Sequence, residues 1–389
     1  MPSPWHVLFV DDDSEICKSA KEFLEADPIN DAGECLLVET ATDFDVTLSE
    51  LEKRYFDMVV LDVKLDAGGV LKEDKGYDVL QSIKQRCFVP VIFYTAVPHL
   101  VRDIESKEKP LIQVVEKTEG LEQVLARIET VLATGIPSLN RALVRHLKVI
   151  QRDYMWGFVA EHWDQFGGTS DRTALAYLLA RRMAMSLSGS GIRQLACDLG
   201  ELGDIVTAEG RVHPMQYYVM PPVEASPLAG DIYQGRIEEQ DGYWVLVTPS
   251  CDLVTGREKA EWVLFARCLL LAEQDEYKSW EESLPDTAPK IEERLKLLLK
   301  NRRKRAQQDR FYFLPGAINL PDLVVDFQQL VVLAHEHLGE LNRLTSLDDP
   351  FADAVLTQFT RFFGRLGTPD LELEAVLTRH RSMPDRKTD

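Results

Sequence analysis

The sequence predicts an α/β fold at the N-terminus, with a five-stranded doubly wound parallel sheet, followed by a helical connector and an α+β region. Up to residue 134, short apolar runs alternate with longer segments of helical periodicity. The runs are apolar almost throughout, which is typical of strands buried on both faces. Beyond residue 134, long helical patterns come first and strand-like runs follow.

The five expected strands are β-branched or aromatic runs that are too short for helices. They are HVLFV (6–10), CLLVET (35–40), DMVVLDV (57–63), VPVIFYTA (89–96) and LIQVVEK (111–117). The segments between and after them are SEICKSAKEFLEA (14–26), DFDVTLSELEKR (43–54), GYDVLQSIKQR (76–86), VPHLVRDIESKE (97–108) and LEQVLARIETVLAT (121–134). Alternation of this kind predicts a parallel sheet with helices on both faces, and we expect Ser14 to cap the first helix.

Polar residues follow the strands at their carboxyl ends. They are Asp11, Asp12 and Asp13 after the first strand, Asp62 after the third, Thr95 at the fourth and Lys117 at the fifth. In a parallel sheet these ends lie on one edge, where ligands bind. Neighbouring carboxylates disfavour each other's ionisation, and a bound Mg²⁺ with oxygen ligands relieves that cost. The pattern therefore predicts a metal site at this edge.

These residues, in this order, resemble the receiver domain of two-component response regulators, a flavodoxin-like fold. The interval from Thr95 to Lys117, 117 − 95 = 22 residues, is the usual one in that family. The resemblance implies that Asp62 accepts a phosphoryl group from a histidine kinase or a phosphotransfer protein. It also implies that Mg²⁺ is held by Asp12, Asp62 and the backbone carbonyl of Lys64, with Asp11 contributing mainly through water.

Two further roles come with the resemblance. Lys117 would pair with the phosphoryl group, and Thr95 would hydrogen-bond it once it has formed, so that the chemistry becomes a surface change. Such a domain catalyses only its own phosphorylation and dephosphorylation. Asp13 has no role in the family, and we interpret it as the acidic neighbour of the first helix, where the dipole favours an anion.

The sequence departs from the family at three places beside this site. The loop VKLDAGGVLKEDK (63–75) is longer than usual, Thr118 replaces a proline that commonly forms a cis bond, and Val114 replaces a common aromatic switch residue. An alternative follows, in which an atypical receiver is locked in one state and serves as a docking domain.

A helical connector is expected over 135–205. SLNRALVRHLKVIQRDYMWGFVAEHWDQF (138–166) predicts a long helix, broken near Gly157, which is either a dimer-forming connector or an ordinary packed helix. A second helix is expected over 170–189 and a short third one over 192–203. The third carries one arginine among acidic residues, which is unlike a helix that reads DNA.

The output region, 206–389, changes to a strand pattern. DIYQGRIEE (231–239), GYWVLVTP (242–249) and EWVLFARCLL (261–270) predict a small antiparallel sheet or barrel, with QDG (240–242) as a hairpin turn. Its GDI opening resembles small RNA-cleaving toxin barrels, but this likeness is too short to transfer any catalytic role. A final amphipathic helix is expected over 348–367, and the last dozen residues are expected to be disordered.

Two groups of residues are candidates for an output site. Cys251 and Asp252 follow a strand, and Arg302, Arg303 and Arg305 belong to a basic run with aromatic residues close behind. The cysteine is either a nucleophile or a structural thiol. The basic run has three alternative interpretations: it binds a nucleic-acid strand, it docks onto the acidic N-terminal domain, or it is simply a solvated helix end.

Composition limits the function classes. The chain has 389 residues and a net charge of −20, which argues against binding nucleic acid over its whole surface. No stretch is apolar enough to span a membrane, and the six cysteines have no paired spacing, so a cytoplasmic protein with reduced thiols is expected. We therefore expect a response regulator of a two-component phosphorelay whose output region acts through protein–protein interaction. A receiver-gated nucleic-acid hydrolase or nucleic-acid-binding output is the alternative.

Overall fold

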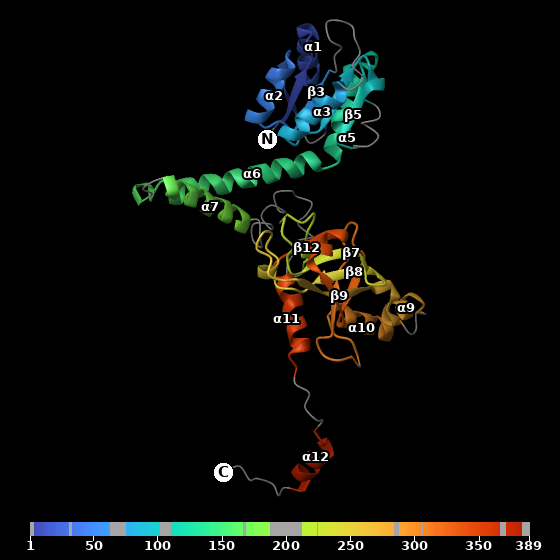
Figure 1. Ribbon diagram of the computed structural model, residues 1–389. Helices are drawn as coiled ribbons and strands as arrows, with labels where there is room; N and C mark the ends of the chain where they lie inside the picture. The colour runs from blue at the N-terminus through green and yellow to red at the C-terminus, as the bar shows by residue number, and fades with distance from the viewer. Residues whose placement is uncertain are drawn as a thin grey trace, which may run out of the picture. The chain divides into compact units, whose positions relative to one another are not determined.

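Two separate sheets organise the chain, one in each of two units, Met1–Val206 and Thr207–Asp389 (Figure 1). The computed structural model describes residues 4–30, 33–62, 75–101, 110–165, 169–186, 212–223, 225–283, 288–304, 306–365 and 371–382. None of the helices within these ranges is both long and apolar enough to cross a lipid bilayer. The five cysteines within them, Cys17, Cys35, Cys87, Cys251 and Cys268, are free thiols, as expected.

The first sheet has five parallel strands in the order β2-β1-β3-β4-β5. The strands are β1 (Trp5–Val10), β2 (Leu36–Ala41), β3 (Met58–Leu61), β4 (Val91–Thr95) and β5 (Ile112–Glu116). This confirms the predicted doubly wound fold, and the strand order is that of flavodoxin-like domains.

Helices cover both faces of this sheet. They are α1 (Ser14–Leu24), α2 (Phe44–Lys53), α3 (Lys75–Arg86) and α5 (Gly120–Ala133), and a 3-10 turn, η1 (Pro98–Leu100), follows β4. Successive residues of β1 alternate between two cores: Val7 and Phe9 pack with α1 and α5, while Leu8 and Val10 pack with α2 and α3. Burial on both faces explains why the strands are apolar throughout.

The cap of α1 differs from the prediction. Asp13, not Ser14, is the N-cap, and its Oδ1 accepts the N–H of Glu15 at 2.9 Å. Ser14 is the first residue of the helix. A carboxylate at the N-cap satisfies a free N–H and also interacts favourably with the helix dipole, so Asp13 is the stronger cap here.

The segment predicted to be a connector begins with a long helix, α6 (Ile136–Tyr154), as expected. It passes into a π-helical turn over Met155–Val159 that contains Gly157, where the sequence predicted a break. The helix α7 (Thr169–Ser186) follows. The third predicted helix, 192–203, and Cys197 within it lie outside the described residues.

The second sheet is antiparallel, with seven strands in the order β10-β11-β9-β8-β7-β12-β6. Its strands are β6 (Tyr218–Val219), β7 (Asp231–Ile237), β8 (Gln240–Leu246), β9 (Trp262–Leu270), β10 (Phe311–Leu314), β11 (Leu323–Ala334) and β12 (Asn342–Leu347). The hairpin turn between β7 and β8 was misplaced by the prediction. The turn is Glu238–Glu239, with Glu238 at φ +54°, and 240–242 begin β8 in register with β7.

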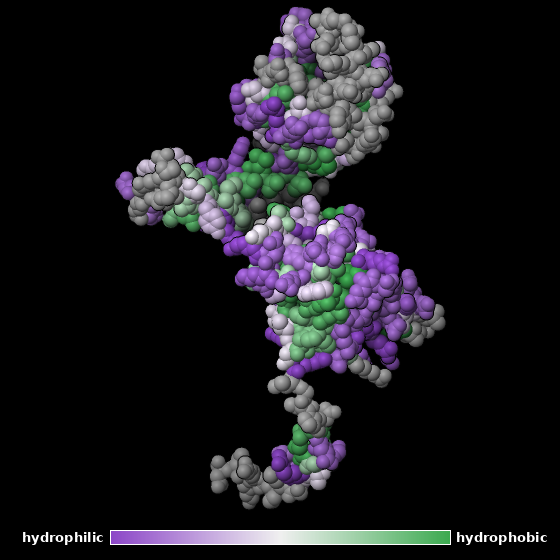
Figure 2. Space-filling view, viewed as in Figure 1, coloured by the Kyte–Doolittle hydropathy of each residue, from purple (hydrophilic) through white to green (hydrophobic). Residues whose placement is uncertain are grey.

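Three helices pack in the second unit. They are α9 (Asp275–Glu281), α10 (Ala288–Leu299) and α11 (Phe351–Phe363). One sheet face remains partly open, because Trp262 and Val332 are 61% and 50% exposed, and Figure 2 shows an apolar area on this unit. The prediction that α11 is the last helix was wrong, since α12 (Leu373–Ser382) follows it. Its acidic first turn and basic last turn suit the helix dipole.

Candidate functional site

The acidic residues of the first unit lie together at the carboxyl edge of its sheet. The Asp62 N–H donates to the carbonyl of Val10 at 2.9 Å, so the end of β3 lies beside the end of β1. One carboxylate oxygen from each of Asp11, Asp12 and Asp62 lies within 4.8 Å of the others. Asp11 is buried, Asp12 is exposed and Asp62 is half-buried. Repulsion among three carboxylates at this spacing requires a compensating positive charge.

Lys117 supplies part of that charge. It follows β5, and its Nζ lies 2.7 Å from Asp11 Oδ2 and 2.8 Å from Asp62 Oδ2. Burial tends to lower the pKa of Lys117, but its hydrogen bonds and ion pairs with the two carboxylates outweigh burial and raise the pKa above its usual value. The ammonium therefore stays charged and joins the ends of three strands.

Thr95 is the last residue of β4 and is fully buried. It lies in register with Glu116, the residue before Lys117, on the neighbouring strand. Its Oγ1 accepts the N–H of Val97 at 3.1 Å, which ties the hydroxyl to the loop after β4. The structure thus places all the predicted side chains at one edge of the sheet.

The arrangement suits a hard divalent cation. Among the described residues of this edge, three carboxylates lie close to one ammonium, and carboxylate oxygens are ligands that Mg²⁺ prefers. Asp11 is already engaged through both oxygens, because Oδ1 accepts the Asp13 N–H at 3.0 Å and Oδ2 pairs with Lys117. Residues 63–74, which include Lys64 and all of the long loop except Lys75, lie outside the described residues.

The departures from the family pattern have defined places in the structure. Val114 is buried in β5 and packs in the core that α2 and α3 cover. Thr118 lies in a 3-10 turn, Lys117–Glu119, directly after β5. Sequence reasoning missed Tyr94, whose ring centroid lies 5.9 Å from Lys117 Nζ. The sequence did offer one indication that Tyr94 lies near the site, because it directly precedes Thr95.

Residues 7–129 match the family model described as the response regulator receiver domain. This part of the chain is a receiver domain. The assignment rests on that match and on the five-stranded parallel sheet. No curated protein matches the chain.

Solved structures similar to the chain include other receiver domains. A CheY-like receiver domain protein from Methanospirillum hungatei JF-1 is 24% identical with a TM-score of 0.26, and the match covers 34% of this chain and 96% of that one. The chemotaxis protein CheY4 of Vibrio cholerae is 24% identical with a TM-score of 0.26, covering 33% of this chain and 99% of that one. An endoribonuclease from a mycobacterial species is 13% identical with a TM-score of 0.22, and the match covers 37% of this chain and 95% of that one.

The receiver domain is joined to α6 at the opposite edge of its sheet. Arg141 Nε donates to Asp57 Oδ1 at 3.0 Å, and Nη2 pairs with the other carboxylate oxygen. The guanidinium also lies 3.8 Å from the ring centroid of Trp5, and Nη2 donates to the Pro4 carbonyl at 3.0 Å. Arg141 and Asp57 are separated by 84 residues, and no local pattern in the sequence points to their pairing.

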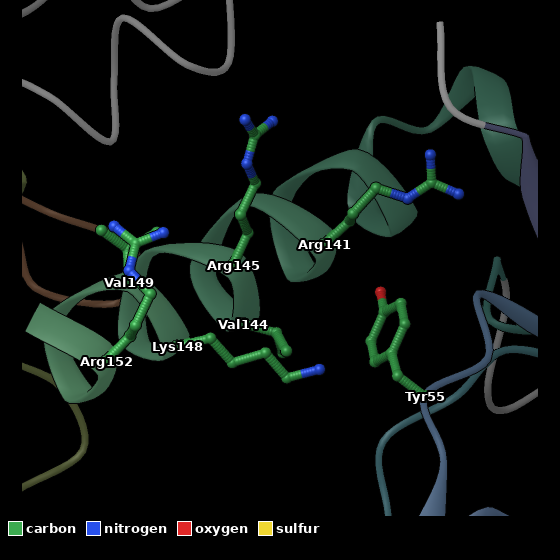
Figure 3. A pocket seen from close by; sticks show the side chains of 7 residues that line it. All are labelled: Tyr55, Arg141, Val144, Arg145, Lys148, Val149 and Arg152. Atoms are coloured by element: carbon green, nitrogen blue, oxygen red, sulfur yellow. The ribbon is translucent and has the colours of Figure 1, made fainter. Parts of the chain in front are cut away.

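A groove of about 470 Å³ runs between α6 and the receiver domain (Figure 3). Its lining consists of Tyr55, Arg141, Val144, Arg145, Lys148, Val149 and Arg152. The four basic residues recur every three or four positions, which places them along one side of α6. Burial raises the pKa of Tyr55 well above its usual value, so its hydroxyl stays neutral. The basic spacing is visible in the sequence, but the prediction of this helix rested on its apolar positions.

The predicted output residues do not form one site. Cys251 and Asp252 lie in a 3-10 turn, Ser250–Asp252, and Cys251 is exposed with its Sγ 3.6 Å from Asp252 Oδ1. Within the described part of the chain, no hydrogen bond or ion pair links either residue to Arg302 or Arg303. Arg305 lies outside the described residues.

Proposed function

We propose that this chain is a response regulator of a two-component phosphorelay, in which Asp62 accepts a phosphoryl group from a histidine kinase or a phosphotransfer protein. One observation carries the proposal: the carboxylates of Asp11, Asp12 and Asp62 gather within 4.8 Å, and Lys117 bonds to two of them. The Asp62 side chain is 8% exposed and lies between an ammonium and the proposed cation site, so its carboxylate is well placed to act as a nucleophile toward phosphorus.

Mg²⁺ is the cofactor that the residues fit. We propose Asp12 and Asp62 as its direct carboxylate ligands, with the Lys64 carbonyl as a third. Asp11 would act mainly through water, because both of its oxygens already accept hydrogen bonds. When bound, the ion would neutralise negative charge on the phosphoryl oxygens during transfer.

The protein's own residues would carry the remaining steps. An oxygen of Asp62 forms a bond to phosphorus as the bond from phosphorus to the donor's imidazole nitrogen breaks, and the imidazole leaves. Lys117, already 2.8 Å from Asp62 Oδ2, would then pair with the phosphoryl oxygens. The Thr95 Oγ1 accepts the Val97 N–H, so a rotation of the side chain that brings its O–H to the phosphoryl group would move Oγ1 away from Val97. That exchange would change the loop after β4, and hence the surface.

The output is proposed to act through protein–protein interaction. We propose a receiver domain over 1–134, a connector over 135–205 and an output region over 206–389. The 138–166 helix is a candidate surface for a homodimer, since Leu139 and Val149 of α6 are 49% and 36% exposed. The hydrolase alternative gains no support at Cys251, which has no histidine or cation among its described contacts.

Intact-mass spectrometry after incubation with acetyl phosphate and Mg²⁺ tests the proposal. We expect the wild type to gain one phosphoryl group and Asp62→Asn to gain none. Asp13→Asn is a matched control, because Asp13 is a neighbouring carboxylate that caps α1, and this variant should still be phosphorylated. If the wild type gains nothing from acetyl phosphate or from a panel of phosphorylated histidine phosphotransfer proteins, the locked docking domain is the better interpretation.

A further inference from the structure

The loop between α10 and β10 is held in an uncommon backbone conformation. Asn301 and Asp309 have φ of +61° and +60°, in the left-handed region that Asn and Asp adopt more readily than other non-glycine residues. Side chains fix the loop, because Asn301 Oδ1 accepts the Phe313 N–H at 2.7 Å and Gln358 Nε2 donates to the Phe311 carbonyl at 2.7 Å. The left-handed Asn301 ends α10, because the N–H groups of Asn301 and Arg302 donate to the carbonyls of Leu298 and Leu297, at 3.0 and 2.9 Å.

Two arginines of this segment are structural. Arg303 donates to both carboxylate oxygens of Glu276, at 2.9 and 2.8 Å, and Arg310 pairs with both oxygens of Asp326, at 2.8 and 2.7 Å. Their guanidinium carbons lie 4.8 and 4.7 Å from the ring centroid of Phe311. Each charge is neutralised by its own carboxylate, so neither arginine is available to hold a ligand's anion.

Lys300 and Arg302 are different. Both are exposed, and among the described residues neither pairs with a carboxylate. Both line a cavity of about 620 Å³. Gln307, Gln308 and Asp309 line the same cavity. Two unneutralised cations beside a polar cavity are unexpected in a chain with a net charge of −20.

We propose that this cavity binds a phosphorylated small molecule of nucleotide size. Lys300 and Arg302 would hold the phosphate, because ammonium and guanidinium groups form charge-assisted hydrogen bonds to it. The Asp309 carboxylate is suited to accept hydrogen bonds from ribose hydroxyls, and the side-chain amides of Gln307 and Gln308 are suited to hydrogen-bond to the edges of a base. The volume lies within the usual range for small-molecule sites.

The charge of the chain favours a small ligand over a long strand. The further phosphates of a nucleic-acid strand would be repelled by a protein with a net charge of −20. The phosphate of a single nucleotide would need only Lys300 and Arg302. The same phosphate chemistry could come from a free nucleotide or from the end of a short oligonucleotide. The inference does not depend on phosphorylation of Asp62, because it rests on residues of the second unit alone.

Isothermal titration calorimetry on the full-length chain tests this site. The probes are inorganic phosphate, AMP, GMP, CMP and UMP, a 5′-phosphorylated tetranucleotide and an oligoglutamate peptide. We expect at least one mononucleotide to bind, and Lys300→Gln with Arg302→Gln to weaken it at least tenfold. Lys296→Gln is the matched control, because Lys296 is an exposed lysine of α10 paired with Glu292 at 2.6 Å, and it should leave the affinity unchanged. The thermal midpoint should not move in either variant, since the replaced side chains are exposed.

Each outcome decides the proposal. Binding of the tetranucleotide but of no mononucleotide, with the same loss in the double variant, would keep the phosphate site and assign it to strand ends. If no nucleotide or phosphate binds at millimolar concentration, the proposal is overturned. It also fails if the double variant binds as tightly as the wild type. Binding of oligoglutamate alone would identify the cations as a docking site for acidic protein instead.

Discussion

Removing the Arg141 guanidinium should destabilise the receiver domain strongly. In the Arg141→Ala variant, the Asp57 carboxylate, whose side chain is 0% exposed, would lose its cation. The hydrogen bond from the His6 N–H, at 2.8 Å, would remain but leaves the charge uncompensated. The structure therefore predicts a much larger effect than a surface ion pair would give.

The magnitude follows from burial. Removing one partner of a buried ion pair typically costs about 3–5 kcal/mol. Because Arg141 is itself 24% exposed, the lower half of that range is expected, and loss of its contact with the Trp5 ring adds about 0.5–1 kcal/mol. Asp57→Asn should cost less, about 1–2 kcal/mol, because the amide oxygen can still accept the His6 N–H and Arg141 can reach water.

Hydrogen exchange in urea, read by mass spectrometry on peptides from β1 and β3, reports on the receiver domain separately from the second unit. Arg145→Ala is the matched control, since Arg145 is exposed on the same helix and pairs with no carboxylate among the described residues. The double variant Asp57→Asn with Arg141→Met should be more stable than Arg141→Ala alone. A cost below about 1 kcal/mol for Arg141→Ala would show that the pair behaves like an exposed one, and the expectation of a large effect would be wrong.

Three further predictions concern other charged groups. Asp13→Ala should lower the free energy of unfolding by about 1 kcal/mol through loss of the α1 cap, as chemical denaturation would show. Lys117→Met should lower the thermal midpoint, because buried Asp11 loses its partner. Added Mg²⁺ should raise the midpoint of this variant by more than it raises that of the wild type. An equal rise in the two proteins would contradict this prediction. Burial tends to raise the pKa of Asp326, but hydrogen bonds from Arg310 and backbone outweigh burial and lower it below its ordinary 3.8. Ionised Asp326 therefore contributes to stability above pH 3.8, and this contribution is lost as the pH falls through the lowered pKa of the folded state. In the Arg310→Met variant, acid should unfold the second unit at a higher pH than in the wild type, as a circular dichroism titration would show.

The acidic edge of the receiver domain could be predicted because one rule of sheet geometry orders it. Asp11 and Lys117 are 106 residues apart, and Asp62 and Lys117 are 55 apart, yet all follow strands of one parallel sheet. Carboxyl ends of parallel strands share an edge, so placing the strands was enough to place the side chains. Burial on both faces made those strands easy to recognise.

Other contacts had no such rule. The pairing of Arg141 with Asp57 depends on where α6 lies against the domain, which no periodicity specifies. The β7–β8 turn was misplaced because Gly242 is a typical turn residue, whereas the chain turns at Glu238 with a positive φ. Arg303 was grouped with its basic neighbours, but its partner Glu276 is supplied by α9, a distant segment. These positions are decided by tertiary packing rather than by local sequence.

The Arg141 contact has a consequence for the direction in which a signal travels. Arg141 contacts Trp5 and Asp57, which lie at the amino ends of β1 and β3. Asp11 and Asp62 follow the carboxyl ends of the same two strands. Binding free energies at two coupled sites are reciprocal. If Asp62 is phosphorylated as proposed, and if a partner of the α6 groove prefers one phosphorylation state, then occupancy of the groove must shift the phosphorylation equilibrium by the same factor. Such a partner would then influence how readily Asp62 accepts a phosphoryl group, and phosphorylation of Asp62 would influence how tightly the partner binds.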